Sequence, residues 1–426
     1  MGTIRVGMFG FGTIGSGLYR LLEENGILLH SREKAEIDIV RVLVRDPNKA
    51  RSAEVPSDRL TTHPGDILDD AGISVVVEVM GGVEPARTLI LEAFRRGKSV
   101  VTANKEVVAT HWDELQAAAR AQGVGFHFEA SVAGGIPILR AIRQSLQANR
   151  IERVMGIING TTNYILTRMS DEGSDFATVL AEARRLGYSE PDPTFDIEGH
   201  DARFKLAILA SLCFGRTVRV QDIHCEGITH ISADDITYGR QLGFAVKLLA
   251  IARETPFGIE ARVHPAFLPL THPLAAVRDA NNAIFVHGNA VGDLMFYGRG
   301  AGALPTASAL VSDLLVCARE EGCRGDACPL PQATEGVGDV LEDWQGEYYV
   351  HLTVDDHPGV LAAIAGIFGR HGVSLASVLQ QGRAEGVAPL IFVTHEAGER
   401  AIRAAMDEIA AHSTVRTVDN LIRVER

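Results

Sequence analysis

The segment DIEGHDARFKLAIL, residues 196–209, places an acid and a base four positions apart. On a helix, Asp201 and Lys205 would share one face. If that face is exposed, the pair stabilises the helix by only about 0.2–0.5 kcal/mol. In a closed site, the lysine ammonium would instead donate a proton and the carboxylate would orient it. The residues that follow, Leu206, Ile208 and Leu209, are apolar, so the pair could lie at a core-facing edge, and both interpretations stay open.

This pair ends the most polar segment of the chain, residues 187–205, which carries four further acids: Glu190, Asp192, Asp196 and Glu198. A solvated acidic loop is the usual interpretation of such a run. A metal site is disfavoured, because His200 alone is not a sufficient set of nitrogen ligands. A second polar segment, NGTTNY at 159–164, predicts a helix N-cap, a polar substrate cradle, or both.

A glycine-rich loop, GFGTIG, follows the first predicted strand and opens a helix. Gly10, Gly12 and Gly15 permit a tight turn, close approach of a pyrophosphate, and packing of the helix on the strand. The helix N-terminus supplies free N–H groups for the phosphates. The loop therefore predicts dinucleotide binding by residues 10–15, that is, by these glycines with Phe11, Thr13 and Ile14. A purely structural glycine turn is the alternative.

The second predicted strand ends in VLVRDPNK, residues 42–49. An acid at this strand end favours NAD through the ribose 2′-hydroxyl, whereas Arg45, assisted by Lys49, suits a 2′-phosphate. Asp46 follows one residue later. This pattern favours NADP, with NAD as the alternative cofactor and a solvated strand end as the alternative role of Arg45.

The segment VTANK, residues 101–105, places Lys105 directly after another predicted parallel strand. Ligands of doubly wound sheets gather at the carboxyl ends of such strands. A lysine at a helix start also opposes the helix dipole, which hints at a use other than stability. We expect Thr102 and Lys105 to lie at the cofactor.

The architecture that must position these residues changes along the chain. Up to about residue 133, buried apolar strands (3–9, 37–44, 73–82, 99–105, 124–130) alternate with helical segments, which predicts an α/β domain with a doubly wound parallel sheet of the Rossmann type. Residues 134–304 predict an α+β substrate-binding and dimerisation domain that starts with a helix at 134–146. We expect the helix at 305–322 to pack back onto the first domain. Residues 347–426 predict a ferredoxin-like βαββαβ domain.

The bulk composition excludes several classes of protein. A net charge of −13, with dispersed basic residues, argues against nucleic-acid binding. No signal peptide and no apolar run of about 18 residues is found, so we expect a cytoplasmic protein without membrane contact. The five cysteines, Cys213, Cys225, Cys317, Cys323 and Cys328, match no zinc spacing and are expected to be reduced thiols.

Six motifs in this order resemble homoserine dehydrogenase: GFGTIG, VTANK, EASVAGGIPIL, GIINGTTNYILT, GYSEPDPTFDIEGHDARFKLAIL and YGRGAGALPTASA, which lie within residues 5–320. The tail from about residue 347 resembles an ACT domain. The resemblance implies reversible, NAD(P)H-dependent reduction of L-aspartate 4-semialdehyde to L-homoserine in threonine, methionine and isoleucine biosynthesis. It implies a homodimer or homotetramer, and threonine as an effector of the ACT domain.

The resemblance also assigns roles to residues. Lys205 matches the proton donor, Asp201 the acidic neighbour that binds substrate or a catalytic water, and Lys105 a lysine facing cofactor and substrate. The matched substrate residues are Glu190, at the amino group, with Tyr188, Thr161 and Asp196 nearby. Gly187 and Gly302 match cofactor-contacting glycines. Glu129, with the backbone carbonyls of Val132, Gly134 and Ile136, matches a site for a monovalent cation, Na⁺ or K⁺.

The chain departs from the family pattern at Arg299, where proline is common, and at Met80, neither of which touches the proposed proton transfer. Two other function classes stay open. A phosphorylating semialdehyde dehydrogenase would need a nucleophilic cysteine, and Cys213 lies in an apolar helical run, a poor place for one. A non-catalytic sensor of nucleotide and amino acid would not need both Asp201 and Lys205.

Overall fold

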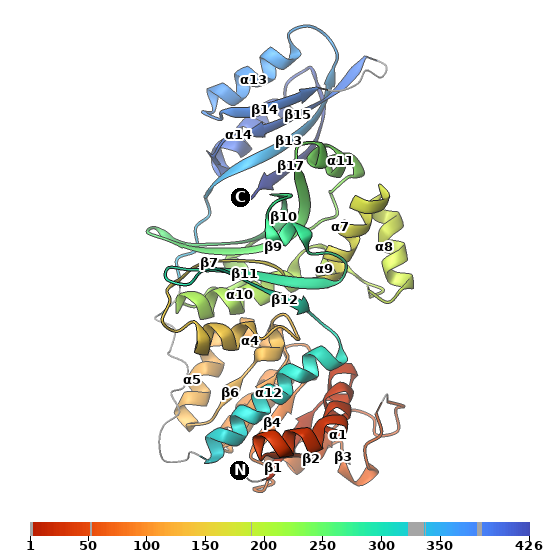
Figure 1. The fold of residues 1–426 in the computed structure, drawn as a ribbon, viewed down its shortest axis with the longest axis vertical. Helices are drawn as coiled ribbons and strands as arrows, with labels where there is room; N and C mark the ends of the chain where they lie inside the picture. Colours follow the sequence, from red (N-terminus) through yellow and green to blue (C-terminus); the bar gives the residue numbers. More distant parts are fainter. Residues whose placement is uncertain (1–2, 52, 189, 323–335, 337, 381–385) are drawn as a thin grey trace. The chain divides into compact units, whose positions relative to one another are not determined.

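The computed structural model describes residues 3–51, 53–188, 190–322, 336, 338–380 and 386–426 (Figure 1). Cys323 and Cys328 lie outside these residues. The chain forms two compact units. Unit 1 comprises Met1–Val154, Asp201–Ile223 and Asn281–Asp339, and unit 2 comprises Met155–His200, His224–Ala280 and Val340–Arg426. This division differs from the three segments expected from the sequence, whose bounds stay a prediction.

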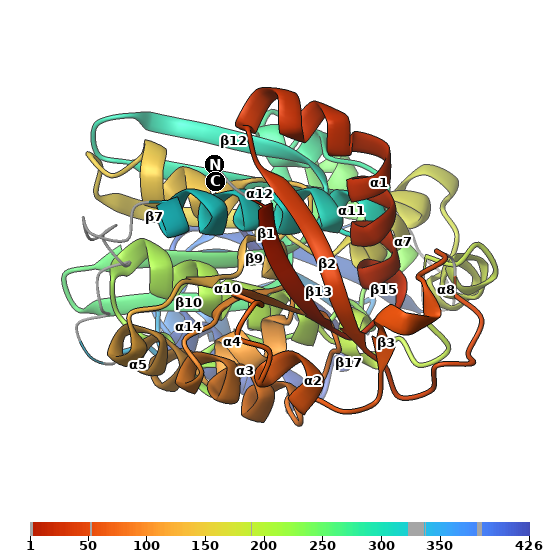
Figure 2. The same ribbon diagram turned by 90° about the horizontal axis from the view of Figure 1, so that it is seen from below.

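Unit 1 contains a parallel sheet in the order β3-β2-β1-β4-β5-β6, which is the Rossmann order predicted from the alternating segments. Its strands are β1 (Thr3–Phe9), β2 (Glu36–Leu43), β3 (Leu60–Thr61), β4 (Val75–Glu78), β5 (Ser99–Thr102) and β6 (Phe126–His127). Figure 2 shows α1 (Thr13–Glu33) and α12 (Ala303–Gly322) on one side of this sheet. On the other side lie α2 (Gly65–Leu68), α3 (Ala86–Arg95) and α5 (Trp112–Gln122). Helices on both faces explain why the central strands are apolar without alternation.

The late helix α12 is part of the core of the parallel sheet. Its buried Ala307, Leu310 and Leu314 pack with Leu18 of α1 and with the central strands. A side chain at position 17 would come within 2.7 Å of the backbone oxygen of Ala303, so glycine is required where the two helices meet. The first domain is therefore completed by a helix that begins at Ala303, far along the chain from the last strand of the sheet, which ends at His127.

The rest of unit 1 contains the helices that carry Lys105, Asp201 and Lys205. It includes α4 (Lys105–Thr110), α10 (His200–Phe214, from Asp201 onward), and the antiparallel hairpin of β11 (Asn281–Gly288) and β12 (Gly292–Arg299). Strand β7 (Ile151–Ile157) crosses the boundary between the units.

Two elements of unit 1 are shorter than predicted. The expected strand at 124–130 is only Phe126–His127, because the backbone oxygen of Phe128 accepts from Ser131 N and closes a turn. The helix expected at 134–146 begins only at Ile138, as α6 (Ile138–Arg140), and continues as a wider π-type turn, η3 (Ala141–Ser145). Gly134 has a φ of +49° and Pro137 lacks an N–H group, so a regular helix cannot start earlier.

Unit 2 holds the C-terminal domain predicted from the βαββαβ pattern. Its elements are β13 (Gln345–Asp355), α13 (Val360–Arg370), β14 (Leu375–Gln380), β15 (Val387–Thr394), α14 (Glu399–Ala410) and β17 (Val415–Val424). The strand order β17-β13-β15-β14 is antiparallel throughout and ferredoxin-like, so this prediction is confirmed. Buried Tyr348, Leu352, Ile364 and Phe392 belong to its core.

The remaining part of unit 2 joins this domain through backbone pairing. The long hairpin of β9 (Phe244–Thr255) and β10 (Gly258–Pro269) extends the sheet, because Ala266 and Phe267 pair in parallel with Arg423 and Val424 of β17. The other elements are α7 (Gly160–Glu172), α8 (Phe176–Arg185), α9 (Thr194–Ile197), β8 (His224–Cys225) and α11 (Ala233–Gln241). None of the helices among the described residues has the length and apolarity needed to cross a membrane.

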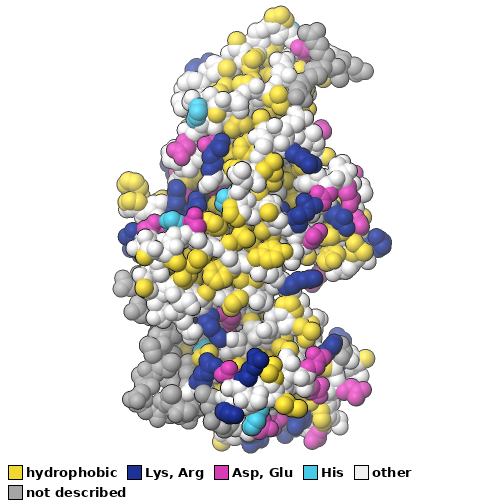
Figure 3. Space-filling model, in the orientation of Figure 1, with side chains coloured by type: hydrophobic (Ala, Val, Ile, Leu, Met, Phe, Trp, Pro, Cys, Tyr) yellow, Lys and Arg dark blue, Asp and Glu magenta, His cyan; other side chains and the backbone are white. Residues whose placement is uncertain are grey.

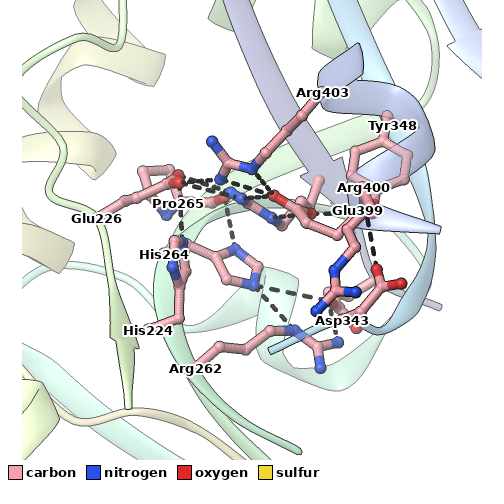
Figure 4. A network of polar contacts seen from close by, with 12 residues as sticks. His224, Glu226, Arg262, His264, Pro265, Asp343, Tyr348, Glu399, Arg400 and Arg403 are labelled. Carbon is pink, nitrogen blue, oxygen red and sulfur yellow. Dashed lines mark hydrogen bonds and ion pairs between the residues drawn. The ribbon is translucent and has the colours of Figure 1, made fainter. Parts of the chain in front are cut away.

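A buried histidine lies at this sheet junction. His264 of β10 has its Nδ1 2.9 Å from the backbone oxygen of Pro265 and its Nε2 3.2 Å from Nε of Arg262 (Figure 4). Burial, together with the charges of Arg423 and Arg262, holds the pKa of His264 well below its ordinary value of 6.5. The folded protein therefore keeps this imidazole neutral, with Nδ1 donating and Nε2 accepting.

We expect the His264→Gln variant to lose less stability in mild acid than wild type. The unfolded chain binds a proton at His264 below about pH 6.5, whereas the folded chain does not. The contribution of His264 to the free energy of unfolding is therefore complete above pH 6.5 and is lost as the pH falls. The loss is about 1.4 kcal/mol for each pH unit. Melting temperatures measured at pH 7.5 and 5.5 should therefore differ less in the variant, by a few degrees. An equal difference in both proteins would contradict this assignment.

Candidate active site

The acid–base pair of the sequence lies in α10, and it is buried. Lys205 Nζ is 2.7 Å from Asp201 Oδ2, and the two residues are 9% and 5% exposed. The helix continues through buried Leu206, Ala207 and Ile208, so the side of α10 that carries the pair is held in the interior. The interpretation as an exposed salt bridge is therefore excluded. A buried ammonium held by a carboxylate is the arrangement that a positioned proton donor needs.

Asp201 contacts a second lysine from a distant part of unit 1. Nζ of Lys105, the first residue of α4, is 3.1 Å from Asp201 Oδ1. Asn104 caps α4 by accepting from Val107 N, which fixes the start of the helix. One carboxylate thus bridges two ammonium groups, and the cluster Lys105–Asp201–Lys205 carries a formal charge of +1. Such a cluster can stabilise an oxyanion and protonate it.

Sequence reasoning missed Glu78, the last residue of β4, which is fully buried. Its carboxylate accepts from Thr102 Oγ1 at 2.7 Å and from Met80 N at 2.8 Å. Thr102 Oγ1 in turn accepts from Asn104 N at 3.0 Å. Glu78 therefore ties the end of β4 to the turn that leads into Lys105. Burial raises the pKa of Glu78. In the sequence, the one sign of this role was an acid in an otherwise apolar predicted strand.

The glycine loop has the geometry that a dinucleotide requires. Gly10 has a φ of +96°, and a side chain there would meet the backbone oxygen of Val79 at 2.9 Å. A side chain at Gly15 would meet Gly10 O at 2.8 Å, whereas one at Gly12 would enter open space. Gly12 is the N-cap of α1 and offers no side-chain cap. The first N–H groups of α1 and the open space at Gly12 therefore fit a pyrophosphate.

The residues after β2 differ in their availability for a cofactor. Asp46 Oδ1 accepts from Asn48 N at 2.9 Å, so this carboxylate is engaged in its own turn. Arg45 is exposed, and its guanidinium has no hydrogen bond or ion pair to the described part of the chain. Of the two, Arg45 is therefore the better placed to receive a phosphate.

Four of the predicted substrate residues, Thr161, Tyr188, Glu190 and Asp196, lie in unit 2, in α7, in the loop before α9 and in α9 itself. Thr161 Oγ1 donates to the backbone oxygen of Tyr188 at 2.9 Å, and the Tyr188 ring stacks on Tyr164. Asn159 Nδ2 donates to Asp196 Oδ1 at 2.7 Å, while its side-chain oxygen caps α7. The helix N-cap predicted from the NGTTNY segment is therefore confirmed, at Asn159, and its role as a substrate cradle stays a prediction. Glu190 and Gly187 lie in the loop that carries Tyr188, and Gly187 has a φ of +77°.

The predicted cation residues lie in unit 1. The carboxylate of Glu129 accepts from Leu139 N at 3.0 Å and from Arg140 N at 2.7 Å. Burial and the nearby Asp313 carboxylate raise the pKa of Glu129 to about 7. Among the described residues, no cluster of three or more His, Cys, Asp or Glu side chains forms a metal site. Val132, Gly134 and Ile136 lie in the turn that follows Glu129, and carboxylate and carbonyl oxygens are the ligands that a hard cation prefers, so the cation site stays a prediction.

Two further observations complete the account of the predicted residues. Gly302 directly precedes α12 with a φ of +120°, a conformation that side chains rarely adopt. Cys213 lies in α10, and desolvation raises the pKa of its thiol to about 12, which argues against a nucleophilic thiolate.

The chain is similar to known proteins over its whole length. Family models described as "Homoserine dehydrogenase", "Homoserine dehydrogenase, NAD binding domain" and "ACT domain" match residues 137–315, 10–129 and 348–413. The homoserine dehydrogenase of Synechocystis sp. is 44% identical over 437 residues, with 99% of each chain covered.

Solved structures of homoserine dehydrogenases are also similar to this chain. A homoserine dehydrogenase from Thiobacillus denitrificans has a TM-score of 0.93 and 42% identity, with 99% of this chain and 98% of that chain covered. A hyperthermophilic archaeal homoserine dehydrogenase in complex with NADPH has a TM-score of 0.64 and 26% identity, with 78% of this chain and 100% of that chain covered.

Proposed function

The chain belongs to the homoserine dehydrogenase family of NAD(P)-dependent oxidoreductases that act on a CH–OH group, and from this premise we propose that Lys205 is its proton donor. The observation that carries the proposal is the bridging of Lys205 and Lys105 by the buried Asp201 carboxylate. In the reductive direction, an aldehyde oxygen gains negative charge as the carbonyl carbon is reduced. A neighbouring ammonium lowers the energy of that charge and can transfer a proton to it.

The chain's residues have separate tasks in this mechanism. NADPH supplies the hydride when it is bound. Lys205 protonates the alkoxide in reduction and accepts the proton in oxidation, directly or through water. Asp201 orients the ammonium and takes part in binding the substrate or that water. Lys105 adds a second positive charge beside cofactor and substrate, and Glu78 holds its turn in place.

We propose that the amino-acid part of the substrate is bound by the polar residues of unit 2. Its ammonium group needs carboxylates, and Glu190 and Asp196 supply two. Thr161 and Tyr188 provide hydroxyl groups. The hydrogen bond between Thr161 and Tyr188 O, and that between Asn159 and Asp196, support a preformed arrangement of these residues.

We propose NADP as the preferred cofactor because Arg45 is available and Asp46 is engaged. The NADPH-bound archaeal relative supports the choice. Gly10, Phe11, Gly12, Thr13, Ile14 and Gly15 would hold the pyrophosphate side, with Thr102, Lys105, Gly187 and Gly302 at other parts of the cofactor. The test is the initial rate of homoserine oxidation at 340 nm with NADP and with NAD. A wild-type rate that is higher with NAD at equal concentrations would contradict the preference.

The Arg45→Ala variant should raise KM for NADP by about 10–100-fold and leave KM for NAD within about twofold. The reason is that a hydrogen bond to a charged phosphate contributes about 1.5–3 kcal/mol, and NAD lacks the 2′-phosphate. Lys49→Ala, which removes the assisting charge four residues later, should have a smaller effect. Equal changes of KM for both cofactors would show that Arg45 does not read the 2′-phosphate.

We propose a monovalent cation site formed by Glu129 and the carbonyls of Val132, Gly134 and Ile136. The fixed orientation of the Glu129 carboxylate by two backbone N–H groups supports it. Na⁺ or K⁺ should then raise the melting temperature relative to tetramethylammonium at equal ionic strength. The same shift in Glu129→Gln would refute the site.

We also propose that threonine binds the ACT domain and changes the rate of homoserine oxidation. The domain is present and complete in its strand order, which supports the proposal. Absence of any threonine effect on rate or melting temperature would refute it.

We propose, finally, that the chain assembles as a homodimer or homotetramer. Strand β12 ends its sheet, and it exposes Met295 and Tyr297 on one face. Figure 3 shows hydrophobic side chains gathered over this part of unit 1. An edge strand that exposes a methionine and a tyrosine is a suitable interface. Light scattering coupled to gel filtration measures the mass, and a monomer at micromolar concentration would refute the assembly.

A further inference from the structure

One of the contacts between the C-terminal domain and the rest of unit 2 is made by a buried arginine. Arg423, close to the end of β17, is 2% exposed. Its guanidinium donates to Glu399 of α14 at 2.5 Å, within its own domain. It also donates to both carboxylate oxygens of Glu226, at 2.6 and 3.0 Å. Glu226 directly follows β8, outside the C-terminal domain.

The two carboxylates lie side by side and share their cations. Figure 4 shows Glu226 and Glu399 directed toward each other, with Arg403 beside them. Arg403 lies 2.7 Å from Glu399 and 3.1 Å from Glu226, and His224 Nε2 lies 2.8 Å from Glu226. Burial raises the pKa of Glu226, but the hydrogen bonds from His224 and Arg423 outweigh this effect and hold the pKa low. Glu226 is therefore an ionised group in a fixed place.

The backbone around Glu226 packs against the end of α9 and the residue that follows it. Ile228 N donates to Ile197 O at 2.8 Å, and Cys225 Sγ donates to Glu198 O at 3.3 Å. A side chain at Gly227 would come within 2.3 Å of Ile197 O. Residues 225–228 therefore cannot move without moving residues 197–198. Ile197 is the last residue of α9, and Asp196 precedes it.

We propose that Arg423 and Glu226 are positioning residues for Asp196, and that the C-terminal domain sets the affinity for the amino-acid substrate through them. The inference rests on the proposed role of Asp196 in binding the substrate. The route has three steps: Arg423 holds Glu226, residues 225–228 hold residues 197–198, and these residues hold Asp196. Asn159 fixes the Asp196 carboxylate from the other side. A change in the C-terminal domain that displaces Arg423 would thus alter KM for homoserine rather than the proton transfer at Lys205.

The test is a functional double-mutant cycle. The variants are Glu226→Gln, Arg423→Met and the double variant, with kcat, KM for homoserine, KM for NADP and melting temperature measured for each. Each single change should raise KM for homoserine about tenfold, and the double variant should raise it no further, because both act through one contact. KM for NADP should stay within about twofold. Arg423→Lys, which keeps the charge, should restore part of the affinity.

Arg416→Met is the matched control. Arg416 lies on the same strand, pairs with Asp355 at 2.6 Å inside the C-terminal domain, and is exposed. Its variant should keep the wild-type KM for homoserine. If Arg423→Met does not fold, Glu226→Gln and Arg423→Lys decide the question, since both preserve the shape of the side chain they replace more closely.

Two results would overturn the proposal. The first is an unchanged KM for homoserine in folded Glu226→Gln and Arg423 variants. The second is a loss of kcat in proportion to the unfolded fraction with KM unchanged, which is a purely structural effect. The Asp196→Asn variant distinguishes failure of the positioning role from failure of the proposed substrate role of Asp196. A raised KM there with a normal KM in Glu226→Gln overturns the positioning role alone, whereas a normal KM in Asp196→Asn overturns the substrate role on which it rests.

Discussion

Replacing Lys205 by alanine lowers kcat for homoserine oxidation by about 10²–10⁴-fold, the usual range for loss of a general acid or base. The ammonium is 2.7 Å from the Asp201 carboxylate and buried, so water cannot easily take its place in the same geometry. KM for NADP should change little, because the glycine loop is untouched. The measurement is the initial rate at 340 nm with saturating cofactor, together with the melting temperature.

Lys98→Met is the matched control for the loss of a buried lysine. Lys98 is 3% exposed in unit 1, and its Nζ donates to the backbone oxygens of Asp70 and Ile73 at 2.6 and 2.7 Å. Its removal should lower the melting temperature but keep kcat of the folded protein. A Lys205→Ala enzyme with a near-normal kcat would refute the assignment of the proton donor.

Replacing Asp201 by asparagine lowers kcat by about 10²–10³-fold and also destabilises the fold. The carboxylate bridges Lys105 and Lys205, and an amide would remove the negative charge that lies between the two ammonium groups. Breaking a buried ion pair on one side costs about 3–5 kcal/mol, and the partly exposed Lys105 keeps the effect at the lower end. We expect a melting temperature lower by several degrees and a loss of rate that persists at saturating homoserine.

Asp192→Asn is the comparison within the same acidic segment. Asp192 is exposed, and its carboxylate accepts from Thr194 N and Oγ1 at the start of α9. Asp192 is thus a solvated loop acid, as the usual interpretation of this segment expects. The Asp192→Asn variant should keep kcat within about twofold. An Asp201→Asn enzyme that behaves like Asp192→Asn would show that the bridging carboxylate has no catalytic role.

The sequence alone determined the features that depend on local patterns. Apolar strands alternating with helices specified the parallel sheet, and the glycine spacing located the loop between β1 and α1. Short-range periodicity also specified the βαββαβ order of the C-terminal domain. The pair Asp201–Lys205 could be found because residues four apart share a helix face whatever surrounds the helix. The family resemblance then supplied roles that spacing could not.

The tertiary structure decided everything that depends on contacts between distant segments. Burial of the Asp201–Lys205 pair, which excludes a surface salt bridge, depends on what packs around α10. The approach of Lys105 to Asp201 joins residues that are far apart in the chain. In the sequence, Glu78 is one acid in a predicted strand and Arg423 lies near the end of another. Only the tertiary structure shows their partners, Thr102 and Glu226. The physical reason is that the energy of a charged side chain is set by its surroundings, which the residue's own neighbours in sequence do not specify.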